Sequence, residues 1–179
     1  MLKITIPASE QYDPVNNEFI YTKETTLTME HSLISLSKWE EKWKKPFLSK
    51  EEKTQEESLD YLRCMTITQN VDPNVYKAID PPTMKIINDY MEDTHTATWF
   101  SESSNAPSRD IITAEILYYS MFANGVDIEC AKWHLNRLMT LLRVFAEKNK
   151  PDKKMSRADL FSKQRALNKA RRKRLRTRG

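Results

Sequence analysis

The stretch TTLTMEHSLISLSKWEEKW (residues 25–43) decides the fold class, because its hydrophobic period changes halfway along it. The first five residues are rich in β-branched side chains, and Leu27 and Met29 alternate with threonine as in a half-buried strand. Further on the period becomes that of a helix, with Trp39 and Trp43 on one apolar face. A strand followed closely by an amphipathic helix predicts an α+β fold.

The residues before this stretch predict further strands of the same small sheet. In LKITI (2–6) apolar and polar side chains alternate, and Pro7 ends the run. Asp13-Pro14 and Asn16-Asn17 favour a turn, and FIYT (19–22) again favours a strand. We therefore predict a small antiparallel β-sheet over residues 1–30.

Residues 31–152 are expected to form helices joined by short polar loops. A capping box, in which a hydroxyl is followed three residues later by a carboxylate, occurs at Ser37. Two more occur at Ser49 and Thr54, and one of these two should start the helix that runs through Leu59 and Met65. Pro81 and Pro82 can begin a further helix, since its first turn does not need their N–H groups. Together, capping and periodicity signals predict about five or six helices.

The last part of this region is the most apolar. IITAEILYYSMF (111–122) is apolar on most sides, which predicts a central, buried helix. After a cap at Asp127, apolar residues recur at three- and four-residue spacing along one predicted helix: Ile128, Ala131, Leu135, Leu138, Leu142 and Phe145. Such a seam must pack against another helix.

The positive charge of the chain is concentrated near residue 179. From Lys153 to Gly179 there are twelve Lys and Arg residues and one acidic residue, a net charge of +11. The other 152 residues carry 17 basic and 24 acidic residues, a net charge of −7. We therefore predict a single globular domain over residues 1–152 and a basic helical tail over residues 153–179.

Composition and motifs argue against several classes of function. With only two glycines the chain has no Walker loop and no dinucleotide fingerprint. It has no apolar run near the roughly 20 residues of a membrane helix and no secretory pattern at its start, so we expect a cytoplasmic location. His31, His95 and His134 lack metal-ligand spacing, and nothing supplies a catalytic constellation. We expect a non-enzymatic protein without a metal or a cofactor.

The basic tail has three interpretations that the sequence leaves open. It contacts nucleic-acid phosphates, it docks on an acidic protein surface, or it is the solvated end of a helix. No aromatic residue follows Phe161, so base stacking is not expected. The candidate residues for binding phosphate or an acidic partner are Lys169, Arg171, Arg172, Lys173, Arg174, Arg176 and Arg178.

Five stretches carry a resemblance to a known group of proteins. They are LTMEHSLISLSKWEEKWKKPFLS (27–49), LDYLRCMTITQNVDP (59–73), TATWF (96–100), DIITAEILYYSMFANGVDIECAKWHLNRLMTLLRV (110–144) and RALNKARRKRLRTRG (165–179). Together they resemble small proteins from the late, morphogenesis regions of tailed bacteriophages, and among these the tail assembly chaperone class. The resemblance covers most of the chain and includes no catalytic motif.

The resemblance implies a function and a set of partners. Proteins of this class are small, largely helical and cytoplasmic, and they keep the apolar helices of the tape-measure protein soluble until tail-tube subunits polymerise around it. It therefore implies tape-measure and tail-tube proteins as partners in the host cytoplasm. The candidate partner-binding residues are those of the apolar seam, Ile128, Leu135, Leu138, Leu142 and Phe145, for which an ordinary core helix is the favoured interpretation.

One feature departs from the class, whose members are often acidic. The strongly basic end keeps open an alternative, a structural virion protein near the head–tail junction whose C-terminus contacts nucleic acid or an acidic neighbour. A phage regulator is a third alternative, disfavoured because no recognition motif precedes the tail. The sequence leaves the oligomeric state open.

Overall fold

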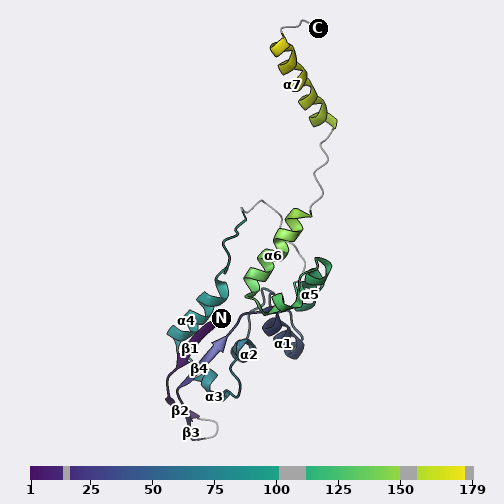
Figure 1. The fold of residues 1–179 in the computed structure, drawn as a ribbon. Coiled ribbons are helices and arrows are strands. Elements are labelled where there is room, and N and C mark those ends of the chain that lie inside the picture. The colour runs from purple at the N-terminus through teal and green to yellow at the C-terminus, as the bar shows by residue number, and fades with distance from the viewer. Residues whose placement is uncertain (14–16, 101–111, 150–156, 176–179) are drawn as a thin grey trace. The chain divides into compact units, whose positions relative to one another are not determined.

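The computed structural model describes residues 1–13, 17–100, 112–149 and 157–175 (Figure 1). The chain divides into two compact units, Met1–Ala146 and Glu147–Gly179. The first unit contains short antiparallel strands and most of the helices, so the predicted α+β class is confirmed. The predicted boundary between residues 152 and 153 lies outside the described residues.

The N-terminal strands form a long two-stranded ribbon. They are β1 (Leu2–Ile6), β2 (Ser9–Asp13), β3 (Glu18–Thr22) and β4 (Thr25–Met29). β1 pairs with β4 and β2 pairs with β3, both antiparallel. Ile6 pairs with Thr25 and Ser9 pairs with Thr22, so the two ladders share one register across the interruption at Pro7, which has no N–H to donate. The small antiparallel sheet predicted over residues 1–30 therefore consists of two ladders.

Alternation along the ladder of β1 and β4 produces one face of the first core. Ile4, Ile6, Leu27 and Met29 are buried, whereas the threonines between them face outward or lie at the edge. The buried face packs against α2 (Gln55–Met65), α3 (Asn74–Lys77) and α4 (Pro81–Glu92).

Two of the predicted helix starts are confirmed. In α2, Thr54 Oγ1 accepts from the N–H of Glu57, and the Glu57 carboxylate accepts in return from the N–H of Thr54. The α4 helix begins at Pro81 and Pro82, with Asp80 as its cap. The cap works because the side-chain oxygen of Asp80 satisfies the N–H of the third helical residue.

The start predicted for the first helix was wrong. α1 (Leu33–Trp43) begins four residues before Ser37 and is capped by Ser32, whose Oγ accepts from the N–H of Ser35. The hydroxyl of Ser35 accepts from the N–H of Ser32, which completes the capping box. Serine thus takes the role that glutamate or glutamine has in the usual pattern, so the pattern did not reveal it.

The tryptophans of α1 lie in the first core and hold the helix to α2. Trp39 is fully buried, and its Nε1 donates to the carbonyl of Glu57 over 2.9 Å. Trp43 is partly buried, and its Nε1 donates to Asp60 Oδ2 over 2.8 Å. Both indole N–H groups therefore have a partner, which buried tryptophans require.

A second core lies on the other side of α1. It is built from α1, α5 (Ala114–Ala123), the 3₁₀ helix η1 (Ile128–Lys132) and α6 (Leu135–Lys148). The buried carboxylate of Glu40 connects its parts, because Oε2 accepts from the N–H of Ala114 over 2.7 Å and Oε1 accepts from the N–H of Phe47 over 2.8 Å. Glu40 therefore supplies a partner for an otherwise unpaired N–H at the start of α5.

The apolar seam predicted as one continuous helix is interrupted. The 3₁₀ helix η1 ends at Lys132, Trp133 is extended, and α6 begins only at Leu135. At this break the N–H of Leu135 donates to the carbonyl of His31 over 2.7 Å. The interruption allows the N–H of Leu135 to pair with a carbonyl of a distant segment, and periodicity along the chain cannot reveal such a contact.

Candidate functional site

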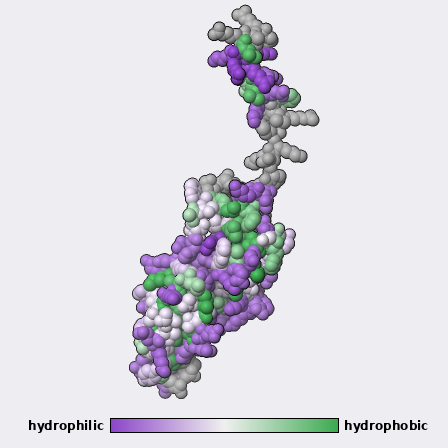
Figure 2. All heavy atoms as spheres, in the orientation of Figure 1, coloured by the Kyte–Doolittle hydropathy of each residue, from purple (hydrophilic) through white to green (hydrophobic). Residues whose placement is uncertain are grey.

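The α5 helix presents an apolar face to solvent. Its inner side chains, Ala114, Leu117 and Met121, are buried in the second core. On its outer side Ile116 is 45% exposed, Tyr119 73% and Phe122 63%, and we call these three residues the α5 face. Figure 2 shows hydrophobic residues gathered over the region of α5 and α6. The predicted central, buried helix is therefore wrong, because the described elements cover only one side of it.

The α5 face has the spacing of a helix-binding surface. Its residues are three apart, so they follow one side of the helix and can contact an apolar helix laid along it. Fully burying a large apolar side chain is worth about 1.5–3 kcal/mol. The sequence does indicate that part of α5 is exposed, because a ten-residue helix that is apolar on most sides has more apolar surface than one neighbouring core can cover.

The predicted partner-binding seam reaches the surface only in part. Leu135 and Leu138 are fully buried in the second core, which makes them packing residues rather than partner contacts in this conformation. Leu142 and Phe145 are partly buried against the same core, and Ile128 is 50% exposed in η1. Only the last three offer surface that a partner could contact.

The basic tail contains one long exposed helix. In α7 (Arg157–Leu175) the side chains of residues 161–175 are all exposed. Lys169, Arg172 and Lys173 are three or four residues apart, so like charges are neighbours on the helix surface. The candidate residues Arg171 and Arg174 are also exposed on α7, whereas Arg176 and Arg178 lie outside the described residues.

All three histidines of the chain lie in one cluster, which the sequence analysis missed. His31 precedes α1, His95 follows α4 and His134 precedes α6. The ring centres of His31 and His134 are 5.2 Å apart, and those of His95 and His134 are 4.1 Å apart. No spacing in the chain indicates this arrangement, because each histidine comes from a different segment. We call the cluster, together with Tyr90 and Asn136, the histidine junction.

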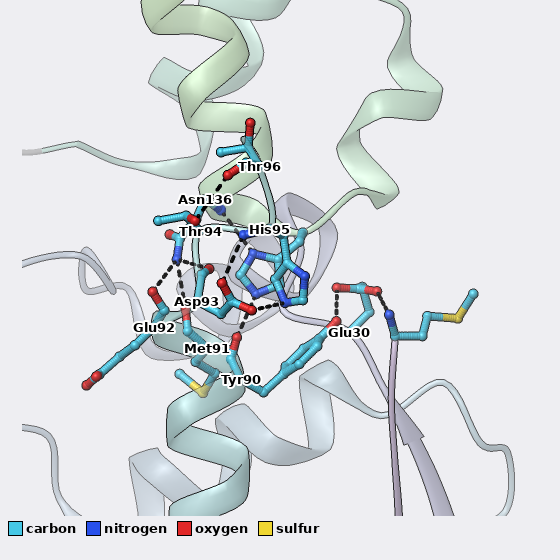
Figure 3. Close-up of polar contacts among 11 residues, drawn as sticks. Glu30, Tyr90, Met91, Glu92, Asp93, Thr94, His95, Thr96 and Asn136 are labelled. Atoms are coloured by element: carbon cyan, nitrogen blue, oxygen red, sulfur yellow. Dashed lines mark hydrogen bonds and ion pairs between the residues drawn. The ribbon is translucent and has the colours of Figure 1, made fainter. Parts of the chain in front are cut away.

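The histidine junction ties the end of α4 to the start of α6 (Figure 3). His134 Nε2 lies 3.0 Å from the carbonyl oxygen of Tyr90, and since a carbonyl only accepts, Nε2 carries the proton. The side-chain amide of Asn136 donates to the carbonyls of Met91 and Asp93, each over 2.9 Å. His134 and Asn136, at the start of α6, thus donate hydrogen bonds to carbonyls that the end of α4 leaves unpaired.

The surroundings of His31 and His134 favour the neutral form of each imidazole. Burial, and after it the neighbouring His134, lowers the pKa of His31 to about 4. Burial and His95 lower the pKa of His134, although the Tyr90 carbonyl and the carboxylates of Glu30 and Asp93 act in the opposite direction. Burial disfavours the charged form of a group, so a histidine without a direct acid partner stays neutral.

A pocket of about 290 Å³ opens beside the junction and is lined by both charged and aromatic residues. The charged residues on its wall include Glu30, Lys132 and Arg137. Across the residues that the structure describes, no group of three or more His, Cys, Asp or Glu side chains could hold a metal ion. Among the described helices, none combines the length and the hydrophobicity needed to cross a bilayer.

Comparison with known proteins gave no match among protein-family models, curated proteins or solved structures. The candidate sites are therefore the α5 face, the basic residues of α7 and the histidine junction, each defined by its own geometry.

Proposed function

We propose that this chain is a non-enzymatic tail assembly chaperone of a tailed bacteriophage, which binds tape-measure and tail-tube proteins in the host cytoplasm during virion morphogenesis. The resemblance of five stretches of sequence supports the phage class. The α5 face carries the proposal, because three exposed apolar side chains at helical spacing suit the apolar helices that such a chaperone keeps soluble.

The way α5 is held supports the same function. Its inner side is packed in the second core, and Glu40 holds its first N–H group. A binding face on a fixed helix loses little conformational freedom when a partner docks, which favours affinity. The exposed side chain of Ile128 and the partly exposed Leu142 and Phe145 add apolar area from neighbouring elements of the same unit.

Replacing both Tyr119 and Phe122 with serine is expected to weaken partner binding while leaving the fold intact. Both side chains are mostly exposed, so their loss should change the free energy of unfolding by less than about 1 kcal/mol. In co-expression with the tape-measure protein of the same phage, we expect the soluble tape-measure fraction to fall at least about tenfold, a loss of about 1.4 kcal/mol or more in binding free energy.

Ile86→Ser provides the matched control, because Ile86 is 51% exposed on α4, away from the α5 face. This variant should keep the tape-measure protein as soluble as the unmodified chain does. If the Tyr119/Phe122 double variant solubilises the tape-measure protein equally well, the α5 face is not the binding surface. If the unmodified chain leaves it insoluble, the chaperone function itself is excluded.

A second candidate function is favoured by α7. Its exposed cations, including Lys169, Arg172 and Lys173, suit a structural virion protein near the head–tail junction whose C-terminus contacts nucleic acid or an acidic neighbour. Like-charge neighbours destabilise a helix in water, so a polyanion would stabilise this one.

Replacing Arg172 and Lys173 with glutamine is expected to weaken DNA binding by this helix in a defined way. Each phosphate contact contributes about 0.9 to the magnitude of the slope of log K against log salt concentration. Losing two contacts should therefore reduce that magnitude by about 1.8. Fluorescence anisotropy with duplex DNA over a series of salt concentrations measures this slope. Deleting residues 153–179 should remove the binding, and unchanged affinity after that deletion would exclude the nucleic-acid interpretation.

A further inference from the structure

We propose that the histidine junction is an acid-sensitive latch, which holds the end of α4 to the start of α6 while His134 is neutral and opens when His134 is protonated. This device concerns the folded first unit itself. It does not depend on the proposed function, and its tests use the purified chain without a partner.

The hydrogen bonds of His134 use both ring nitrogens in one protonation state. Nε2 donates to the carbonyl of Tyr90, and Nδ1 accepts from the N–H of Asn136 over 3.3 Å. A second proton would sit on Nδ1 and point at the N–H of Asn136, so an acceptor at the helix start would become a donor. Protonation therefore removes the cap that His134 provides to α6.

The position of His134 makes the positive charge costly for two further reasons. His134 directly precedes α6, and the N-terminal end of a helix already carries partial positive charge. The ring of His95 is centred 4.1 Å away, and Lys132 and Arg137 line the same pocket. A protonated His134 would thus share the pocket with two cations, Lys132 and Arg137, as well as with the carboxylate of Glu30.

The acidic groups around His134 have other partners. Glu30, at the end of β4, accepts from the hydroxyl of Tyr90 over 2.7 Å and from the Met1 amine over 2.9 Å. Asp93, after α4, accepts from the N–H of His95 over 3.2 Å. Both carboxylates stabilise the cation from a distance, and neither forms a hydrogen bond with His134 in the structure.

The remaining neighbour of His134 also favours the neutral form. His31, between β4 and α1, is buried, and its Nδ1 lies 2.6 Å from the hydroxyl of Tyr61. Its own protonation would place a second charge 5.2 Å from the His134 ring. His31 and His134 therefore resist protonation together.

Opening the latch would free several backbone groups at once. The Asn136 amide would leave the carbonyls of Met91 and Asp93, and the N–H of Leu135 would lose its bond to His31. Leu135 and Leu138 are fully buried at present. Loosening the start of α6 is the movement that would bring them toward solvent.

The direction of the pH effect follows from the lowered pKa values of His31 and His134. Below the ordinary histidine pKa of about 6.5, the open form binds more protons than the closed form. The latch is therefore intact above about pH 6.5 and weakens as the pH falls from there toward the pKa of the closed form.

Hydrogen exchange of the Asn136 N–H in the full chain tests the latch directly. Between pH 7 and pH 5 we expect its protection factor to fall about tenfold, as the open form gains a proton that the closed form lacks. The control is the N–H of Glu57, which Thr54 caps in α2 and which should change less than about twofold. An equal change at both amides would overturn the proposal, because acid would then act on the whole unit.

His134→Asn separates the latch from general acid sensitivity. Asparagine is a favoured N-cap, so its side-chain oxygen can accept from the N–H of Asn136 without a titratable group. We expect this variant to keep Asn136 protected at pH 5, and retention of the acid response would overturn the proposal. If the variant does not fold, NMR titration of the unmodified chain decides: a His134 midpoint at or above 6.5 would rule the latch out.

Discussion

Replacing Trp39 with alanine is expected to lower the free energy of unfolding of the first unit by about 3–5 kcal/mol. Trp39 is 1% exposed, and its ring centre lies 5.0 Å from that of Phe47 and 6.2 Å from that of Trp43. Truncation leaves a cavity between α1 and α2 and removes the bond from Nε1 to the Glu57 carbonyl. Urea denaturation at neutral pH, followed by circular dichroism, measures the change.

Tyr119→Ala is the control for this prediction, because it removes an aromatic side chain that is 73% exposed. We expect it to change the free energy of unfolding by no more than about 0.5 kcal/mol. If Trp39→Ala were as mild as Tyr119→Ala, the first core would not be packed as the structure has it.

Glu40→Ala is expected to cost about 3 kcal/mol of stability, because it leaves two N–H groups without their acceptor. The N–H of Ala114 is buried with its residue, whereas Phe47 is only partly buried and can recover some hydration. Loss of the Glu40 carboxylate also removes a negative charge from the N-terminal end of α5, where the helix dipole favours one. Thermal and urea unfolding measure the destabilisation.

The variant Glu40→Gln should have a free energy of unfolding between those of the unmodified chain and Glu40→Ala. Its amide oxygen can accept one of the two hydrogen bonds, whereas its NH₂ group faces the other donor. Glu41→Ala, at an exposed neighbouring position, should change stability by no more than about 0.5 kcal/mol. If Glu40→Gln were indistinguishable from the unmodified chain, the carboxylate would not be holding the start of α5.

Local patterns were sufficient to predict the elements whose causes are local. The alternation in LKITI and TTLTM places Ile4, Ile6 and Leu27 in the core, as the structure confirms. Of the two capping boxes that the sequence offers here, at Ser49 and Thr54, the one at Thr54 caps the start of α2. The two capping groups lie three residues apart, and alternation within a single strand is enough to show which of its side chains share a face.

The features that escaped prediction depend on contacts between distant segments. The Glu40 carboxylate was assigned to a local capping box, but it binds the N–H of Ala114, 74 residues away. His31 and His134 are more than a hundred positions apart, and their rings meet only because α1 and α6 start side by side, joined by the bond from Leu135 to His31. Neither spacing nor composition contains that information.

The α5 helix shows a different limit. Its sequence correctly indicates many apolar side chains, and the prediction assumed that all of them would be covered. Among the residues that the structure describes, one core lies beside α5, so Leu117 and Met121 are buried while Tyr119 and Phe122 remain exposed. Composition indicates how much apolar surface a helix has, but the number of neighbouring elements determines how much of it is covered.

The central claim is that the chain is a chaperone that acts during assembly and is then released. The location of the chain after infection tests this claim most directly. Intact virions would be purified on a density gradient, and both virions and the soluble lysate would be probed with an antibody to this chain. The proposed function predicts that the chain is absent from virions and is soluble in the lysate, where it co-precipitates with the tape-measure protein. Stoichiometric amounts in purified virions would contradict it and favour the structural role of the basic C-terminus.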